Sequence, residues 1–70
     1  MAEVPAHITG TVWKIETKIG DQVKTGDVLV ILESMKMEMP VEAPADGKVA
    51  EIRCKESQPV SEGDVLIVLK

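Results

Sequence analysis

Two short apolar runs dominate the hydrophobic pattern of the chain, at residues 28–32 (VLVIL) and 65–69 (VLIVL). Each run follows a Gly-Asp pair, at residues 26–27 and 63–64, in which glycine permits a positive φ and aspartate can bond the local backbone. Apolar, β-branched runs bounded by turn signals are typical of buried strands. No stretch of the chain combines a helical hydrophobic period with capping residues. The pattern therefore predicts an all-β protein.

The sequence also repeats itself. Residues 4–33 align with residues 41–70 at a constant offset of 37, without a gap, and 12 of the 30 aligned positions are identical. Agreement at this level indicates two copies of one supersecondary unit rather than chance. Short strand-like segments around residues 12–15 and 49–52 recur in both copies. We expect one domain over residues 1–70, built from this internal repeat.

Two equivalent halves, each with one apolar face, can bury those faces against each other. The expected fold is a flattened two-sheet β-barrel or sandwich with pseudo-twofold symmetry. Both termini should then lie at one end, and the link between the halves, residues 34–37, at the other. The chain would reverse there between a strand at 28–33 and a strand at 38–43, with Lys36 at the reversal.

The link lacks the usual chemistry of a tight hairpin. Such a turn favours Asn-Gly or Asp-Gly, because both central residues need a positive φ, yet this link carries Met35-Lys36. A local rule that is broken at one place often marks a functional position. The simpler interpretation is a solvated lysine between methionines that pack. We expect Met39 in the core and Met35 at a partner, with Met37 in either place.

Composition and charge exclude several classes of function. The chain has 8 basic and 12 acidic residues, a net charge of −4, and no basic patch of the kind that binds nucleic acid. No apolar run of about 18 residues or signal peptide is visible, so we expect no membrane association. A single cysteine, Cys54, excludes an intramolecular disulfide, provides too few ligands for a metal site and fits a cytoplasmic setting.

The tetrapeptide at residues 34–37 (SMKM), flanked by Glu33 and Glu38 between two gapless β repeats, resembles the biotinyl/lipoyl carrier domain family over essentially the whole chain. The resemblance implies a barrel-sandwich hybrid of two four-stranded sheets, with the lysine at a hairpin tip joined by an amide to biotin or lipoate. Biotin carriers commonly read Ala/Ser-Met-Lys-Met, whereas lipoyl carriers more often have an acidic residue before the lysine and alanine after it. Met35 and Met37 therefore favour biotin.

The resemblance also implies partners. A biotin protein ligase would biotinylate Lys36, and the tethered biotin would carry a carboxyl group between a biotin carboxylase and a carboxyltransferase. Met35 and Met37 would contact these partners, and Glu33 and Glu38 would help to orient the ligase. The constant offset leaves no room for the "thumb" loop of bacterial acetyl-CoA carboxylase carriers. The chain is thus similar to the thumbless type or to a free-standing attachment protein, and we expect a monomeric carrier that is not itself an enzyme.

Three alternatives remain open. The closest is a lipoyl carrier of a 2-oxoacid dehydrogenase type system, or a domain that accepts either group. A second is an unmodified interaction module, which would share the repeat but gives no reason for Met-Lys-Met. A third is an enzyme that uses Glu33, Glu38 and Glu42, which no nucleophile, histidine or metal ligand accompanies. We interpret His7 as solvated and Trp13 as structural.

Overall fold

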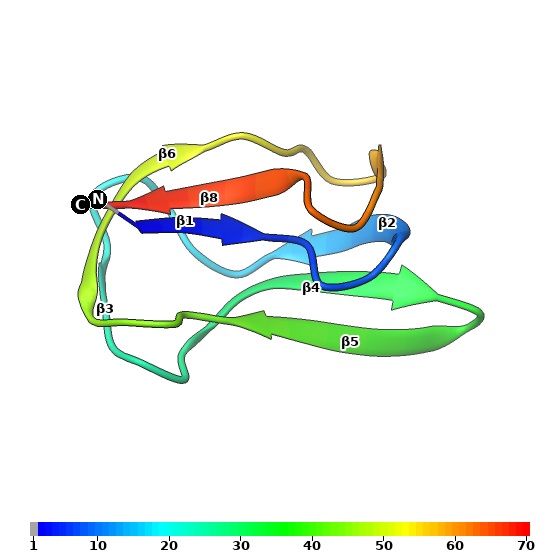
Figure 1. Cartoon of the computed structure of the whole chain (residues 1–70), viewed down its shortest axis with the longest axis horizontal. Helices are drawn as coiled ribbons and strands as arrows, with labels where there is room; N and C mark the ends of the chain where they lie inside the picture. The colour runs from blue at the N-terminus through cyan, green and yellow to red at the C-terminus, as the bar shows by residue number, and fades with distance from the viewer. Residues whose placement is uncertain (1) are drawn as a thin grey trace.

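The computed structural model describes residues 2–70, and in this part of the chain it consists of strands and connecting turns without a helix (Figure 1). The eight strands are β1 (Ala2–Pro5), β2 (Gly10–Ile15), β3 (Gln22–Val23), β4 (Val28–Ser34), β5 (Met37–Glu42), β6 (Gly47–Ile52), β7 (Pro59–Val60) and β8 (Val65–Leu69). They form two four-stranded antiparallel sheets, with strand orders β1-β8-β6-β3 and β5-β4-β2-β7. The prediction of an all-β, two-sheet fold is confirmed.

The two sheets are copies of each other. A shift of 37 residues places β2 on β6, β3 on β7, β4 on β8 and β1 on the second part of β5, so one strand order becomes the other. Contacts between loops repeat as well. The backbone N–H of Gly26 donates to the carbonyl of Ala43 over 2.9 Å, and the N–H of Gly63 donates to the carbonyl of Ala6 over the same distance. The pseudo-twofold symmetry is therefore confirmed.

In the part of the chain that the structure describes, the core cluster between the sheets consists of aliphatic side chains and Cys54. Its large side chains that are removed from solvent come from both copies of the repeat: Val12, Leu29, Val30, Leu32, Val49, Leu66, Ile67 and Leu69. The two runs that the hydrophobic pattern singled out, in β4 and β8, provide most of this set. Each lies second from the edge of its sheet and so has a paired strand on both sides.

The Gly-Asp turns close in the predicted way. Gly26 and Gly63 have φ of 93° and 95°, a conformation that glycine adopts without steric strain. The Oδ2 atoms of Asp27 and Asp64 accept hydrogen bonds from the backbone N–H groups of Lys24 and Ser61, both over 2.9 Å. These turns lead directly into β4 and β8, and they fix where the buried strands begin.

One turn residue adopts the left-handed conformation without being glycine. Ser57 has a φ of 72°, whereas the equivalent position of the first repeat is Gly20, with a φ of 95°. An L-residue in this region loses roughly 1–2 kcal/mol relative to glycine, part of which is offset by the greater backbone entropy of unfolded glycine. Ser57→Gly should therefore raise the free energy of unfolding by about 0.5–1 kcal/mol, as measured by urea denaturation. Ser61→Gly, where φ is not positive, is the control and should give no gain.

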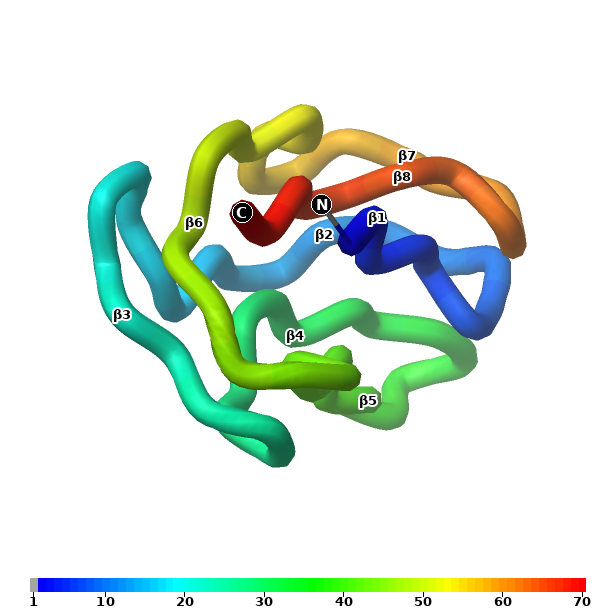
Figure 2. Tube along the Cα trace, turned by 60° about the vertical axis from the view of Figure 1, so that its left-hand side comes forward, coloured from blue at the N-terminus to red at the C-terminus, as the bar shows by residue number. Residues whose placement is uncertain are grey.

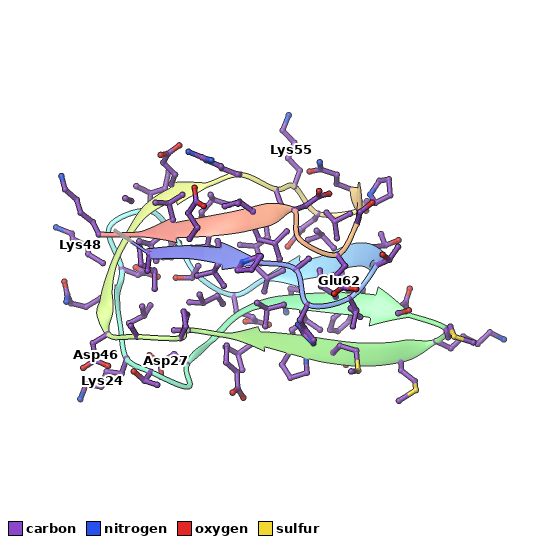
Figure 3. The ribbon with its side chains drawn as sticks, in the orientation of Figure 1. Lys24, Asp27, Asp46, Lys48, Lys55 and Glu62 are labelled. Carbon is purple, nitrogen blue, oxygen red and sulfur yellow. The ribbon has the colours of Figure 1, made fainter. Side chains whose placement is uncertain are left out.

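Asp46 links two loops near the chain termini, beside Lys24 in Figure 3. Its Oδ1 accepts hydrogen bonds from the backbone N–H of Thr25 over 2.8 Å and from the Thr25 hydroxyl over 3.1 Å. The backbone bond, and then the hydroxyl bond, lower the pKa of the Asp46 carboxyl below its ordinary value of 3.8. The carboxylate therefore stabilises the fold above pH 3.8, and this contribution is lost as the pH falls through the lower pKa of the folded state.

Asp46→Ala should accordingly destabilise the protein at pH 7, and the deficit relative to the wild type should shrink as the pH drops below 3.8. The equivalent position of the first repeat offers a matched control. Thr9 Oγ1 accepts a hydrogen bond from the backbone N–H of Glu62 over 3.1 Å and does not titrate. The deficit of Thr9→Ala should stay constant with pH in thermal unfolding scans. A pH-independent deficit for Asp46→Ala would contradict the assignment.

The molecule is elongated, with principal extents of 31 × 18 × 18 Å, and its two ends differ. The β4–β5 hairpin forms one end, and the first and last strands, β1 and β8, bring Ala2 and Leu69 together at the other (Figure 1). Figure 2 looks more nearly along the long axis from the terminal end, where β3 lies beside β6 in front. The placement of the termini and the link at opposite ends is confirmed. In the described residues no helix has the length and apolar character needed to cross a membrane.

Candidate functional site

The hairpin between β4 and β5 places Lys36 at the tip of the molecule. The last cross-strand pair is Ser34 with Met37, so the turn consists of Met35 and Lys36 alone. Their φ angles are 52° and 65°, as a two-residue type I′ turn requires. The expectation of a link at 34–37 between strands at 28–33 and 38–43 is therefore corrected. Because Met35 and Lys36 both adopt a positive φ, two residues are enough for the turn. Strand β4 therefore extends to Ser34, and strand β5 begins at Met37.

This turn forms without the residues that usually favour it. A non-glycine residue in the left-handed region carries a penalty of roughly 1–2 kcal/mol, and the turn contains two such residues in succession. The cross-strand pairs below the turn impose this conformation, because β4 and β5 remain paired up to Ser34 and Met37, the two residues that flank the turn. Lys36 is thus held at a defined position by the paired strands.

The side chains at the tip face solvent. Met35 is 92% exposed and Met37 is 62% exposed, which is unusual for large apolar residues and typical of a surface that contacts partners. Lys36 is exposed as well. Over residues 2–70 the ion pairs join Arg53 to Glu3 and Glu51, so the Lys36 amine has no carboxylate partner. The tip therefore presents one unpaired amine between two accessible thioethers.

Met39 differs from its expected position. It pairs with the buried Leu32, but its own side chain is only partly buried and lies outside the core cluster. The reason is its location on β5, which is an edge strand and has a neighbouring strand on one side only. The spacing of Met37, Met39 and Val41 does predict one face of the strand, but burial along that face increases only with distance from the tip.

Glu33 and Glu38 lie directly opposite each other in the β4–β5 ladder, one pair below Ser34 and Met37. Both are exposed. Like charges at directly opposed positions destabilise an antiparallel pair, so this arrangement is not explained by hairpin stability. It places two carboxylates in the second cross-strand pair from the turn that holds Lys36. The structure thus brings all five predicted site residues (Glu33, Met35, Lys36, Met37 and Glu38) together at one end of the molecule.

Exposure alone does not single out Lys36. The other lysines are also exposed, but they lie on strands, in loops or at the chain end: Lys14, Lys18, Lys24, Lys48, Lys55 and Lys70. In Figure 3, Lys24 and Lys48 are at the terminal end and Lys55 is on the flank, away from the hairpin. What separates Lys36 from them is its position in a two-residue turn at the end of the long axis.

The other candidate residues lie outside the β4–β5 hairpin. Cys54 is buried at 6% exposure, and desolvation raises the pKa of its thiol, which disfavours the reactive thiolate. Trp13 is 47% exposed and sits at a register shift in β2. His7 is exposed in the loop after β1. Among the described residues, the side chains of these three form no hydrogen bond or ion pair with the hairpin.

Sequence reasoning missed one residue next to the site. Gly10, the first residue of β2, lies so close to the end of β4 that a β-carbon at this position would be 2.5 Å from the carbonyl oxygen of Glu33. A signal was available, because Gly10 matches Gly47 in the repeat alignment. Glycine inside a strand often marks a close approach of another backbone, but the alignment alone does not say which backbone approaches.

The chain is similar to known proteins over nearly its whole length. The family model described as "Biotin-requiring enzyme" matches residues 1–69. The chain is 47% identical over 66 residues to the biotin/lipoyl attachment protein of Bacillus subtilis, covering 94% of this chain and 90% of that protein. It is 43% identical over 70 residues to a biotinylated protein TB7.3 homolog of Mycobacterium leprae, covering 99% of both.

Among solved structures, the urea carboxylase of Kluyveromyces lactis contains a region that superposes with a TM-score of 0.93 at 38% identity. The match covers 99% of this chain but only 6% of that enzyme. The resemblance that the lysine motif and the repeat indicated is therefore confirmed. The chain belongs to the biotinyl/lipoyl family of biotin-requiring enzymes.

Proposed function

We propose that this protein is a biotin carboxyl carrier in which a biotin protein ligase joins biotin to Lys36 through an amide bond. The observation that carries the proposal is the position of Lys36 at the tip of a two-residue hairpin, exposed, unpaired and flanked by two exposed methionines. Membership of a family of biotin-requiring enzymes supports biotin as the group. The residues present fit such a group, because an amide to Lys36 would extend into solvent and displace no packed side chain.

Each residue of the tip has a defined task in this proposal. The Lys36 Nζ loses a proton and attacks an activated carboxyl group that the ligase supplies, so that one amide bond forms and the activating group leaves. Met35 and Met37 offer flexible, polarizable contact surface that suits more than one partner. Glu33 and Glu38 attract a basic surface on the ligase. Once attached, biotin supplies a ureido nitrogen that can accept and release a carboxyl group.

The partners would be a biotin carboxylase and a carboxyltransferase. The relatives that point to them include large carboxylases, of which this chain spans a small part, such as the 6% of the urea carboxylase. The carrier contributes no catalytic group of its own. It raises the local concentration of biotin at both active sites, which is the advantage of a tethered ligand.

Lipoate is the second candidate for the attached group, because one relative is described as a biotin/lipoyl attachment protein. The Met-Lys-Met sequence favours biotin. Intact mass after co-expression with a biotin protein ligase, and separately with a lipoate protein ligase, decides between them. We expect a gain of one biotinyl group in the first sample. A gain of one lipoyl group alone would move the protein to the other branch, and no gain in either sample would refute the carrier function.

A further inference from the structure

Gly10 lies against the part of β4 that leads into the turn. A β-carbon built at this glycine would be 2.5 Å from the carbonyl oxygen of Glu33 and 3.4 Å from the Cβ of Ser34. Glu33 and Ser34 are the last two residues of β4, immediately before Met35 and Lys36. The absence of a side chain at Gly10 therefore permits a close backbone approach at the base of the hairpin tip.

This contact leaves little room for adjustment. Ordinary van der Waals contact begins at 3.4 Å, so a methyl group at Gly10 would require the two backbones to separate by about 0.9 Å. The obstacle is a carbonyl oxygen rather than a flexible side chain. Glu33 is paired on both sides, with Thr11 on β2 and with Glu38 on β5. A displacement of Glu33 would consequently be transmitted through the β4–β5 ladder to the turn.

We propose that Gly10 is a positioning residue for the acceptor lysine: its close packing on the end of β4 sets the turn that presents Lys36 to the ligase. The inference rests on the proposed function of Lys36. The turn needs such support because its two central residues hold a positive φ without glycine or asparagine. Displacing a reacting group by about 1 Å can lower a rate roughly 10²-fold.

The repeat supplies a matched control. Gly47 is the equivalent of Gly10, and a β-carbon there would lie 3.1 Å from the carbonyl oxygen of Lys70, at the terminal end of the molecule. That contact is relieved by a shift of a few tenths of an ångström. Gly47→Ala therefore places the same methyl group at the same position of the equivalent strand, away from Lys36.

The experiment compares the wild type, Gly10→Ala and Gly47→Ala. Initial rates of biotinylation at Lys36 are measured with a biotin protein ligase, at a temperature well below the unfolding midpoint of each variant. We expect kcat/KM to fall about 10- to 100-fold for Gly10→Ala and to stay within about twofold of the wild type for Gly47→Ala. Backbone amide shifts of residues 33–38 should move in Gly10→Ala only. Chemical acylation of Lys36 by a succinimidyl ester of biotin should be equal in all three, because the amine remains exposed.

A folded Gly10→Ala that is biotinylated as fast as Gly47→Ala would overturn the inference. If Gly10→Ala does not fold, the test uses Thr11→Gly, which loosens β2 opposite Glu33, with its repeat equivalent Lys48→Gly as the control. We then expect a several-fold loss of rate for Thr11→Gly alone, and equal rates would overturn the inference. A wild type that the ligase does not modify would refute the proposed function instead, and the amide shifts would still decide whether Gly10 sets the turn.

Discussion

Lys36→Arg should abolish enzymatic biotinylation and leave the fold unchanged. The arginine guanidinium stays protonated in proteins and is not an acyl acceptor, so no amide can form at the tip. The Lys36 side chain is exposed and has no ion-pair partner in the described residues. Its replacement by arginine should therefore alter the free energy of unfolding by less than about 0.5 kcal/mol. Intact mass after co-expression with the ligase measures the first effect, and urea denaturation measures the second.

Lys24→Arg is the matched control for this substitution. Lys24 is also exposed and also borders a turn, but at the terminal end of the molecule (Figure 3). The Lys24→Arg protein should gain one biotinyl group, as the wild type does. Residual modification of Lys36→Arg, with a biotinylated peptide from elsewhere in the chain, would show that the ligase does not depend on the hairpin tip. The assignment of Lys36 would then be wrong.

Leu29→Ala and Leu66→Ala should each destabilise the protein by about 2–5 kcal/mol. Both side chains are fully buried and occupy equivalent positions in β4 and β8, so the two losses should be similar. A 70-residue domain has a total stability of the order of 4–10 kcal/mol. Each substitution therefore removes a large share of it, and the double variant should be unfolded. Thermal and urea unfolding followed by circular dichroism give both values.

The comparison variant is Ile19→Ala. Ile19 is 67% exposed in a turn, so its truncation should change stability by less than about 0.5 kcal/mol. A loss for Leu29→Ala that differs from the loss for Leu66→Ala by several kcal/mol would contradict the equivalence of the two halves of the core. In that case the sequence repeat would describe the backbone but not the packing.

Much of this fold can be predicted from the sequence, because the two hydrophobic runs lie at equivalent positions of the repeat and indicate the same buried strands. The alignment at an offset of 37 places β2 on β6 and β4 on β8, and the Gly-Asp pairs mark the starts of the buried strands. These signals are local, and each copy supports the other. The location of Lys36 at the end opposite the termini follows from the same symmetry, without knowledge of any side-chain contact.

The remaining features depend on contacts that no local pattern encodes. Met35, Lys36 and Ser57 adopt a positive φ because paired strands or the repeat geometry impose it, and their residue types give no indication of it. The partial burial of Met39 depends on β5 being an edge strand, which alternation along one strand does not reveal. The approach of Gly10 to Glu33 joins residues more than twenty positions apart, and only the assembled sheet brings them together.

The opposite placement of the termini and the hairpin determines how far Lys36 can reach from a point of attachment. Any chain joined to Ala2 or Lys70 would be attached at one end of the 31 Å long axis, with Lys36 at the other. The folded domain would then act as a stiff lever about as long as that axis, and a flexible linker would add its own length to this radius. A short linker would suffice to serve two active sites several tens of ångströms apart, because most of the travel would come from rotation of the rigid body.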